Sequence, residues 1–332
     1  MKIHLVCLRE GSYAAMLQLA QQAEPRLHTL VEDPASADMI LFVGGWKAYG
    51  EGVADSPLPR LYPEKTFIYL DDDGFTPLLP GVYTNAERPG WWSGWLGSRA
   101  ESQMFVDVLN PRIRPMQVEK KYLFSFAGGS TSLLRKRLYR VRFGRPDVWV
   151  ENTSNYYHWD PSQPGREERQ RQYAERIASS HFGLCPRGAS AGGLRLYEVM
   201  QMGVAPVVIS DRLLLPEGPD WESFAIRVPE RRIKQLDRIL ERHLGESEER
   251  GRLARAAYEQ WFAPEVVFNH VVAACERRRA ERRIPERWVQ PFWGYMLWRV
   301  RLGRRARGLA KQMVLGVFRL LGRRFIYELN AR

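Results

Sequence analysis

Cysteine is scarce in this 332-residue chain, and the three cysteines, Cys7, Cys185 and Cys275, stand far apart. Small disulfide-stabilised domains carry dense, even sets of cysteines, and thiolate metal sites need close pairs such as C-x-x-C. Neither pattern is present in the sequence. The sequence therefore argues against a disulfide framework and a cysteine metal site, and it favours a reducing compartment.

Long hydrophobic runs are also lacking. A conventional membrane-spanning helix needs about 20 consecutive apolar residues, and no such stretch occurs. The apolar run that starts at Ile3 is interrupted by Arg9, which makes it too short for the core of a signal peptide. We interpret this run as a buried strand and expect a cytoplasmic protein.

Net positive charge is missing from most of the chain, although the formal net charge of the whole is +12. Residues 276–332 hold 16 lysines and arginines against 4 acidic residues, so the remainder is neutral as a whole. A nucleic-acid-binding domain carries a basic binding face or a recognisable motif. Because neither accompanies the neutral body, we expect no nucleic-acid partner, and the basic end indicates a surface-targeting element.

The first third of the chain alternates short apolar runs with one helical pattern. Strands are expected at 3–8, 39–43 and 67–70, with a helix near 13–22. Such alternation is typical of a parallel sheet covered by helices. A polar stretch with two prolines at 110–115 then interrupts the pattern and suits a linker between domains.

A second alternation begins at residue 122. Strands are expected at 122–126, 148–150, 182–185 and 205–209, helices at 132–142, 167–178 and 194–202, and longer helices at 230–243, 248–262 and 264–283. Two successive series of this kind predict an α/β protein with two Rossmann-like domains that face a cleft. We expect a first domain at 1–115, a second at 116–283 and a basic helical tail at 284–332.

The expected strand at 182–185 leads into a loop that suits a phosphate. The loop holds Arg187 and the glycine pair Gly192 and Gly193, and the next helix presents Arg195 and Glu198 on one face. The amino end of a helix after a parallel strand offers N–H groups to an anion. Arg195 could then bind a diphosphate while Glu198 accepts hydrogen bonds from ribose hydroxyls. Taken alone, the pair also fits an ordinary surface salt bridge.

A second phosphate feature lies upstream, at the end of the expected strand 122–126. Gly128 and Gly129 would let a ligand approach the backbone closely, and Arg135 in the following helix could reach its phosphate. The neighbouring arginines 137, 140 and 142 are interpreted as a solvated basic face.

Together these features resemble the exostosin family, glycosyltransferase family 47. The family has a serine-phenylalanine-leucine-cysteine-proline-arginine-glycine run, which corresponds here to the segment 180–188. It also shares the arginine and glutamate three apart, the glycine- and proline-led strand at 203–209 and the later leucine-proline at 215–216. The resemblance covers about residues 120–245.

The resemblance implies a GT-B-like fold in which the second domain binds a nucleotide-sugar donor without any required cofactor or metal. The donor-binding residues that it implies are Gly128, Arg135, Arg187, Gly193, Arg195 and Glu198. The expected reaction is an inverting transfer from a UDP-linked sugar to a glycan acceptor. Gly193-Leu194 stand where many members have a serine, so the donor sugar is left open. Without a signal anchor, the chain looks like the compact versions associated with bacterial surface-polysaccharide assembly.

The catalytic base is expected in the first domain. Asp71 and Asp73 follow an apolar strand, at the sheet edge where active sites form. A carboxylate there could deprotonate the acceptor hydroxyl. The same Asp-x-Asp spacing also fits a metal-dependent glycosyltransferase that holds a divalent cation on the donor, or a simple loop cap. His4 and His158 are alternative bases.

Aromatic side chains could bind the acceptor. Trp46, Trp91, Trp92 and Trp95 are candidates for stacking on a sugar, with core packing as the alternative. A nucleotide- or sugar-binding protein without catalysis is the competing function from another class.

The end of the chain combines aromatics with arginines. Residues 288–298 are rich in tryptophan, 299–307 are strongly basic, and an amphipathic pattern follows. Such a segment can lie in an acidic membrane surface without crossing it. We expect peripheral binding on the inner face of the membrane, next to a lipid-linked acceptor. The alternative is a helical appendage packed on the protein.

Overall fold

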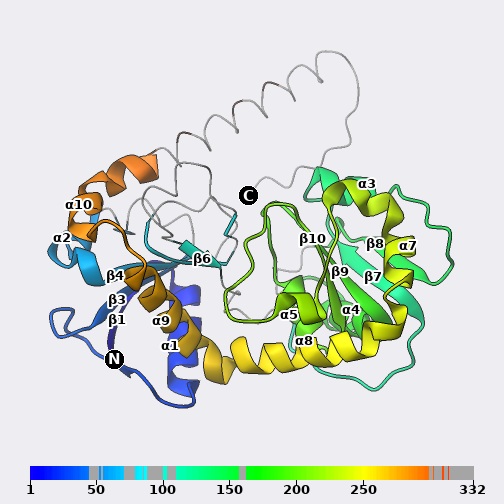
Figure 1. The fold of residues 1–332 in the computed structure, drawn as a ribbon, viewed down its shortest axis with the longest axis horizontal. Helices are drawn as coiled ribbons and strands as arrows, with labels where there is room; N and C mark the ends of the chain where they lie inside the picture. The colour runs from blue at the N-terminus through cyan, green and yellow to red at the C-terminus, as the bar shows by residue number, and fades with distance from the viewer. Residues whose placement is uncertain are drawn as a thin grey trace.

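The computed structural model describes residues 1–44, 52–53, 55–70, 79–84, 86–87, 100–102, 110–156 and 162–298, together with Leu302, Leu309 and Met313. It contains two α/β domains, each built on one parallel sheet (Figure 1). The expected pair of Rossmann-like domains is therefore confirmed.

The first sheet has the strand order β2-β1-β3-β4-β5-β6. Its strands are β1 (Lys2–Cys7), β2 (Thr29–Leu30), β3 (Met39–Gly44), β4 (Thr66–Leu70), β5 (Gly81–Tyr83) and β6 (Ala100–Ser102). Every residue of β3 and β4 is buried, because helices cover both faces of a parallel sheet. The helical elements in this half are α1 (Glu10–Gln22), α2 (Leu58–Leu61) and the 3-10 turn η3 (Pro63–Lys65).

The second sheet has the order β11-β10-β9-β7-β8. Its strands are β7 (Tyr122–Gly128), β8 (Val148–Asn152), β9 (Ser180–Pro186), β10 (Ala205–Ile209) and β11 (Ile226–Arg227). The helical elements here are α3 (Leu133–Leu138), α4 (Arg166–Ala178), α5 (Arg195–Gln201), α6 (Trp221–Phe224), η5 (Glu230–Gln235), α7 (Leu236–Glu241), η6 (Leu244–Glu246) and α8 (Ser247–Trp261). Both sheets place their first strand between their second and third strands. Such an order creates a topological switch point between the first and third strands, where open α/β sheets bind ligands.

Helix α9 (Pro264–Ala280) crosses from the second domain to the first (Figure 1). Its buried residues Val267, Phe268, Val271 and Val272 share one core with α1 and the first sheet. Pro264 occupies the first turn of the helix, where proline favours a new helix start after α8. The helix expected at 264–283 was placed in the second domain from the sequence, whereas in the structure it packs on the first.

The segment after α9 also packs on the first domain. It contains α10 (Glu286–Val289), the 3-10 turn η7 (Gln290–Phe292) and helical residues 293–298. Trp293 and Leu297 are buried against the first sheet. The beginning of the expected tail is thus part of a folded domain. Among the described helices, none has the length and apolar character that crossing a membrane requires.

Candidate functional site

The switch point of the second sheet lies between β7 and β9, which are hydrogen-bonded neighbours. The carboxyl end of β7 is formed by Ala127 and Gly128, and that of β9 by Pro186. Helix α3 follows β7, and α5 follows β9. The residues expected to bind a donor therefore come from two separate strand-helix units that meet at one sheet edge.

Two arginines cross this switch point in opposite directions. Arg135 of α3 donates from Nε and Nη2 to the Pro186 carbonyl at 3.3 and 3.1 Å. Arg195 of α5 donates from Nη2 to the Ala127 carbonyl. Each guanidinium thus comes from the helix after one strand and binds the end of the other strand. These crossed hydrogen bonds hold two positively charged side chains beside the switch point.

The ring of Phe126 supports both arginines. Its centroid lies 4.4 Å from the guanidinium carbon of Arg195 and 5.4 Å from that of Arg135. An aromatic face attracts a cation at such distances and helps to hold it in place. Within the described part of the chain, Arg195 has no carboxylate at ion-pair distance. The charge of Arg195 acts on the nearby Glu198 carboxyl without a direct ion pair, so an anionic ligand could still bind the guanidinium.

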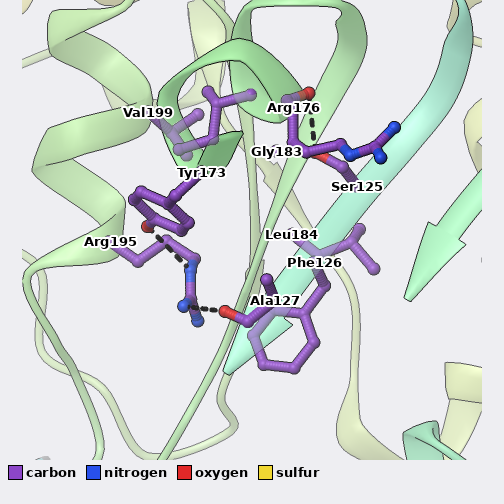
Figure 2. Close-up of a pocket in the computed structure, with 10 residues that line it drawn as sticks. Ser125, Phe126, Ala127, Tyr173, Arg176, Gly183, Leu184, Arg195 and Val199 are labelled. Atoms are coloured by element: carbon purple, nitrogen blue, oxygen red, sulfur yellow. Dashed lines mark hydrogen bonds between the residues drawn. The ribbon is translucent and has the colours of Figure 1, made fainter. Parts of the chain in front are cut away.

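Tyr173 of α4 connects Arg195 to Glu198. Its hydroxyl accepts a hydrogen bond from Arg195 Nε at 3.2 Å and donates one to Glu198 Oε2 at 2.6 Å. Figure 2 shows the Arg195 guanidinium between this hydroxyl and the Ala127 carbonyl. Sequence reasoning missed Tyr173, although it is the one aromatic residue in α4, a helix whose buried residues are Ala174, Ile177 and Ala178. The signal was a lone tyrosine on the buried side of α4.

Burial raises the pKa of the Glu198 carboxyl above its ordinary value, although the Tyr173 hydrogen bond and the Arg195 charge act in the opposite direction. A carboxylate that loses hydration is costly unless a partner compensates it. Glu198 is therefore held in an environment that still lacks part of the stabilisation its charge requires. Hydroxyl donors of a ligand could supply the remainder.

Two small pockets adjoin Arg195. One pocket lies between β7, β9, α4 and α5, and its lining includes Phe126, Tyr173 and Val199 (Figure 2). The other lies at the ends of β9 and β10, and its lining brings together Arg135, Gly193 and Arg195. Three of the six predicted donor residues thus line one pocket.

Gly128 closes the same edge from the β7 side. A Cβ atom on Gly128 would lie 3.0 Å from the Phe126 ring and 3.2 Å from Arg195 Nη2. Such contacts are tight, so a larger residue would displace the arginine or the ring. The absence of a side chain at Gly128 therefore makes room for the Arg195 guanidinium and the Phe126 ring, and the predicted approach of a ligand to this backbone stays a prediction.

Arg187 is engaged elsewhere. Its Nε donates to Glu230 Oε1 at 2.6 Å, and its backbone N–H bonds to the Ile209 carbonyl. These contacts tie the loop after β9 to η5 and to the end of β10. The Arg187 side chain does not line either pocket in the described structure, so its predicted contact with a donor stays a prediction.

Cys185 also lines the pocket at the ends of β9 and β10. Burial raises the pKa of its thiol to about 12. A thiol with such a pKa stays protonated at neutral pH and is a poor nucleophile. Cys185 therefore packs in the wall of the site and does not act as a reactive group.

Most of the residues expected on the acceptor side lie outside the described residues. Asp71 and Asp73, the Trp46, Trp91, Trp92 and Trp95 side chains and His158 all fall there. His4 is described, and its Nδ1 lies 3.0 Å from the Val31 carbonyl. It is the third of the six residues of β1, whose carboxyl end is Cys7. Among the described residues, no cluster of three or more histidine, cysteine or acidic side chains could hold a metal ion.

The loop after β10 joins the site to the first domain. Leu213 lines the pocket at the ends of β9 and β10, and the adjacent Leu214 N–H bonds to the Ala86 carbonyl at 3.0 Å. Arg212 forms an ion pair with Glu87 at 2.8 Å. One short loop therefore contacts the pocket at the ends of β9 and β10 and the first domain at once.

Comparison with known proteins gives a family for the central segment. Residues 92–243 match the Exostosin GT47 domain. An "Exostosin-1 homolog" from Caenorhabditis elegans is 32% identical over 177 residues, which cover 48% of this chain and 46% of that protein. The "Probable glucuronosyltransferase GUT1" from Oryza sativa subsp. japonica is 36% identical over 104 residues, or 31% of this chain and 24% of that protein.

The chain spans less than half the length of these curated relatives. Among solved structures, MurG of Acinetobacter baumannii is similar with a TM-score of 0.38 and 13% sequence identity, over 83% of this chain and 99% of that one. The segment 92–243, which matches the Exostosin GT47 domain, contains all six predicted donor residues. The exostosin resemblance expected from the sequence is thereby confirmed.

Proposed function

We propose that this chain, which carries an Exostosin GT47 domain over residues 92–243, transfers a sugar from a nucleoside diphosphate sugar to a glycan acceptor. The donor is expected to be UDP-linked and the reaction to invert the anomeric configuration. The observation that carries the proposal is the pair of arginines, Arg135 and Arg195, that cross the switch point of the second sheet.

The chemistry of glycosyl transfer suits this arrangement. When the bond between the anomeric carbon and the phosphate oxygen breaks, its electron pair leaves with the nucleoside diphosphate. Fixed cations beside that oxygen stabilise the developing negative charge. Arg135 and Arg195 supply two such cations, and their positions are set before the ligand binds. Glu198, one turn along α5, is placed to accept hydrogen bonds from the ribose hydroxyls.

The base belongs to the first domain in this mechanism. A carboxylate of Asp71 or Asp73 removes the proton from an acceptor hydroxyl as that oxygen attacks the anomeric carbon. The attack comes from the face opposite the diphosphate, so the configuration inverts. In this scheme the arginines neutralise the leaving group, and no cofactor or metal ion is required.

The names of the relatives support glycosyl transfer as a class and leave the sugar open. Besides the rice relative named for glucuronosyl transfer, similar chains include a "Probable beta-1,4-xylosyltransferase IRX10" from Arabidopsis thaliana. Because these named reactions use different sugars, we propose only that a nucleotide sugar is the donor and a glycan is the acceptor. We also propose that the enzyme acts in the cytoplasm, in the assembly of a surface polysaccharide.

Thermal unfolding in the presence of nucleotides tests the donor site. We expect UDP and UDP-sugars to raise the melting temperature more than the free sugars do. A ligand at a hundred times its dissociation constant stabilises the native state by about 2.7 kcal/mol. If free sugars stabilised the protein and UDP and UDP-sugars did not, the proposal that the second domain binds a nucleotide sugar would be wrong. If UDP-sugars stabilised it without measurable transfer or hydrolysis, the chain would be a binding protein.

Chelation tests the absence of a metal requirement. We expect transfer to continue in excess EDTA, because guanidinium groups neutralise the diphosphate. Loss of activity in EDTA and its recovery on adding manganese would instead support the metal-dependent alternative, in which Asp71 and Asp73 hold the cation.

A further inference from the structure

Residues 286–298 form a helical rod with two apolar sides. The inner side packs into the first domain through Val289, Trp293 and Leu297, all buried. Glu286 is fully buried on the same side, and Trp293 Nε1 donates to its Oε1 at 2.8 Å. The rod is therefore a fixed part of the domain surface.

The outer side carries four exposed aromatics. Trp288, Phe292, Tyr295 and Trp298 are 66%, 60%, 57% and 53% exposed. Their spacings of four, three and three residues place them along one face of a helix. The rings of Tyr295 and Trp298 stack with their centroids 5.9 Å apart. We call these four residues the aromatic face. A contiguous exposed apolar surface of this kind marks an interaction site.

Polar contacts at the start of the rod fix the direction of the aromatic face. Glu64 accepts a hydrogen bond from the Arg287 backbone N–H at 3.1 Å and another from Arg282 Nη1 at 3.1 Å. The guanidinium of Arg282 also lies over the Phe67 ring, 5.0 Å from its centroid. With the inner side packed and its start held by Glu64, the aromatic face points to solvent.

Strong positive charge accompanies the aromatic face. Residues 299–332 contain ten lysines and arginines and a single acidic residue. Arg283 precedes the rod, Arg287 lies in its first turn, and both are exposed. Beyond the rod, Leu302, Leu309 and Met313 are helical and about half exposed or more. Apolar and basic groups thus continue together along the chain.

We propose that the aromatic face docks on an anionic lipid bilayer. Tryptophan and tyrosine favour the interface between lipid and water, and basic residues beside them are attracted to acidic headgroups. A second copy of the chain is a poorer occupant, because two such basic segments would repel each other. A neutral glycan would gain nothing from the ten basic residues.

Docking in this way holds the first domain against the membrane, since the rod is packed on that domain. A lipid-linked acceptor would then meet the enzyme on its acceptor side. This consequence rests on the proposed function, whereas docking itself does not.

Vesicle co-sedimentation of the full chain tests the proposal. We compare vesicles of phosphatidylcholine alone with vesicles that also contain phosphatidylglycerol. The variant Trp288→Ser/Phe292→Ser/Tyr295→Ser/Trp298→Ser should bind the anionic vesicles at least about a hundredfold more weakly, because withdrawing each ring from water contributes on the order of tenfold. The matched control is Leu27→Ser/Val118→Ser, which removes exposed apolar side chains from other surfaces.

Binding should also weaken as salt concentration rises. Unchanged sedimentation of the aromatic variant would overturn the proposal, and so would equal binding to neutral and anionic vesicles. A wild-type dimer that the aromatic substitutions dissociate would show that a second copy occupies the face instead. Nucleotide-induced thermal shifts, measured on the same proteins, establish that each variant is folded and report separately on the donor site.

Discussion

Arg195 combines an anchored position with spare capacity for a ligand. A guanidinium has five N–H groups, and the described contacts of Arg195 use Nε and one N–H of Nη2. The Ala127 carbonyl, the Tyr173 hydroxyl and the Phe126 ring therefore hold it without consuming all its donors. An arginine fixed in this way loses little further freedom when it binds phosphate, which favours affinity.

Arg195→Ala should abolish the thermal shift caused by UDP or a UDP-sugar. The substitution should also reduce the stability of the free protein by about 1–3 kcal/mol, because it removes a hydrogen bond to a carbonyl at the strand end. Thermal unfolding with and without nucleotide measures both effects. The control Arg137→Ala removes an exposed arginine of α3 and should change neither. An undiminished nucleotide shift in Arg195→Ala would show that the diphosphate binds elsewhere.

Glu198→Gln should make the free protein more stable than wild type near neutral pH. The pKa of Glu198 is raised in the folded state, so its contribution to stability is complete below the ordinary value of 4.5 and declines as the pH rises through the folded value. Glutamine cannot ionise and avoids that loss. We therefore expect the difference in melting temperature, variant minus wild type, to increase from about pH 4 to about pH 7.

The exposed control Glu167→Gln should show no such trend. A constant difference for Glu198→Gln across this pH range would mean that the carboxylate is already fully stabilised. In that case the site would not need ligand hydroxyls to complete the environment of Glu198.

At the scale of elements, the position of α5 depends on a glycine in the neighbouring strand. A Cβ atom on Gly183 of β9 would lie 2.6 Å from Cγ2 of Val199 in α5. The missing side chain lets the helix pack closely on the sheet, and this packing places Arg195 and Glu198 above the strand ends. Gly183 therefore affects both the packing of α5 on the sheet and the position of the two side chains that are proposed to bind the ligand.

Gly183→Ala should push α5 away from β9. We expect a loss of about 1–3 kcal/mol in unfolding free energy, the usual cost of overpacking a core, and weaker nucleotide binding because Arg195 moves with the helix. Chemical denaturation and nucleotide titration measure the two effects. Gly245→Ala is the matched control, since a Cβ there meets nothing within 4 Å. If Gly183→Ala kept the full affinity for nucleotide, nucleotide binding would not depend on the position of α5.

Most central elements were predictable because their apolar pattern is continuous. Strands β3, β4 and β10 are wholly buried, and their sequences read as uninterrupted apolar runs. The short strands β2 and β11 have two residues each, too few to produce a pattern. The helix expected at 132–142 ends at Leu138, where the chain turns. The apolar periodicity of this segment indicated a helix but did not show at which residue the helix ends.

The sequence named residues for the candidate site but could not give its geometry. The run at 180–188 and the helix after it pointed to Arg195 and Glu198, and the separate upstream feature pointed to Gly128. It could not reveal that Arg135 binds the Pro186 carbonyl, because this contact depends on β7 and β9 being neighbours in the sheet. Tyr173 was missed for the same reason. Its helix precedes the motif, and only the tertiary packing brings its hydroxyl to Glu198.

On the scale of the whole molecule, the two domains are connected by more than their linker. Helix α9 leaves the second domain and completes the core of the first. The loop after β10 adds the Arg212–Glu87 ion pair, and its Glu217 contacts buried Arg278 of α9 at 3.0 Å. An amphipathic helix pattern tells which residues are buried and gives no information on which sheet they cover. The destination of α9 could therefore not be derived from the sequence.

These connections meet beside the pocket that contains Arg135 and Arg195. A ligand that orders the loop after β10 would act on the contacts with Ala86 and Glu87 as well. The donor side and the acceptor side of the proposed enzyme are thus mechanically linked at the place where transfer is proposed to occur.

Hydrogen exchange of the full chain, with and without the nucleotide that gives the largest thermal shift, tests the donor site most directly. A donor bound at the second switch point should slow exchange in the segments 126–135 and 186–200, while β1 and β3 of the first sheet exchange as before. Slowed exchange centred on the first sheet, with the segment 186–200 unchanged, would contradict the proposed donor site.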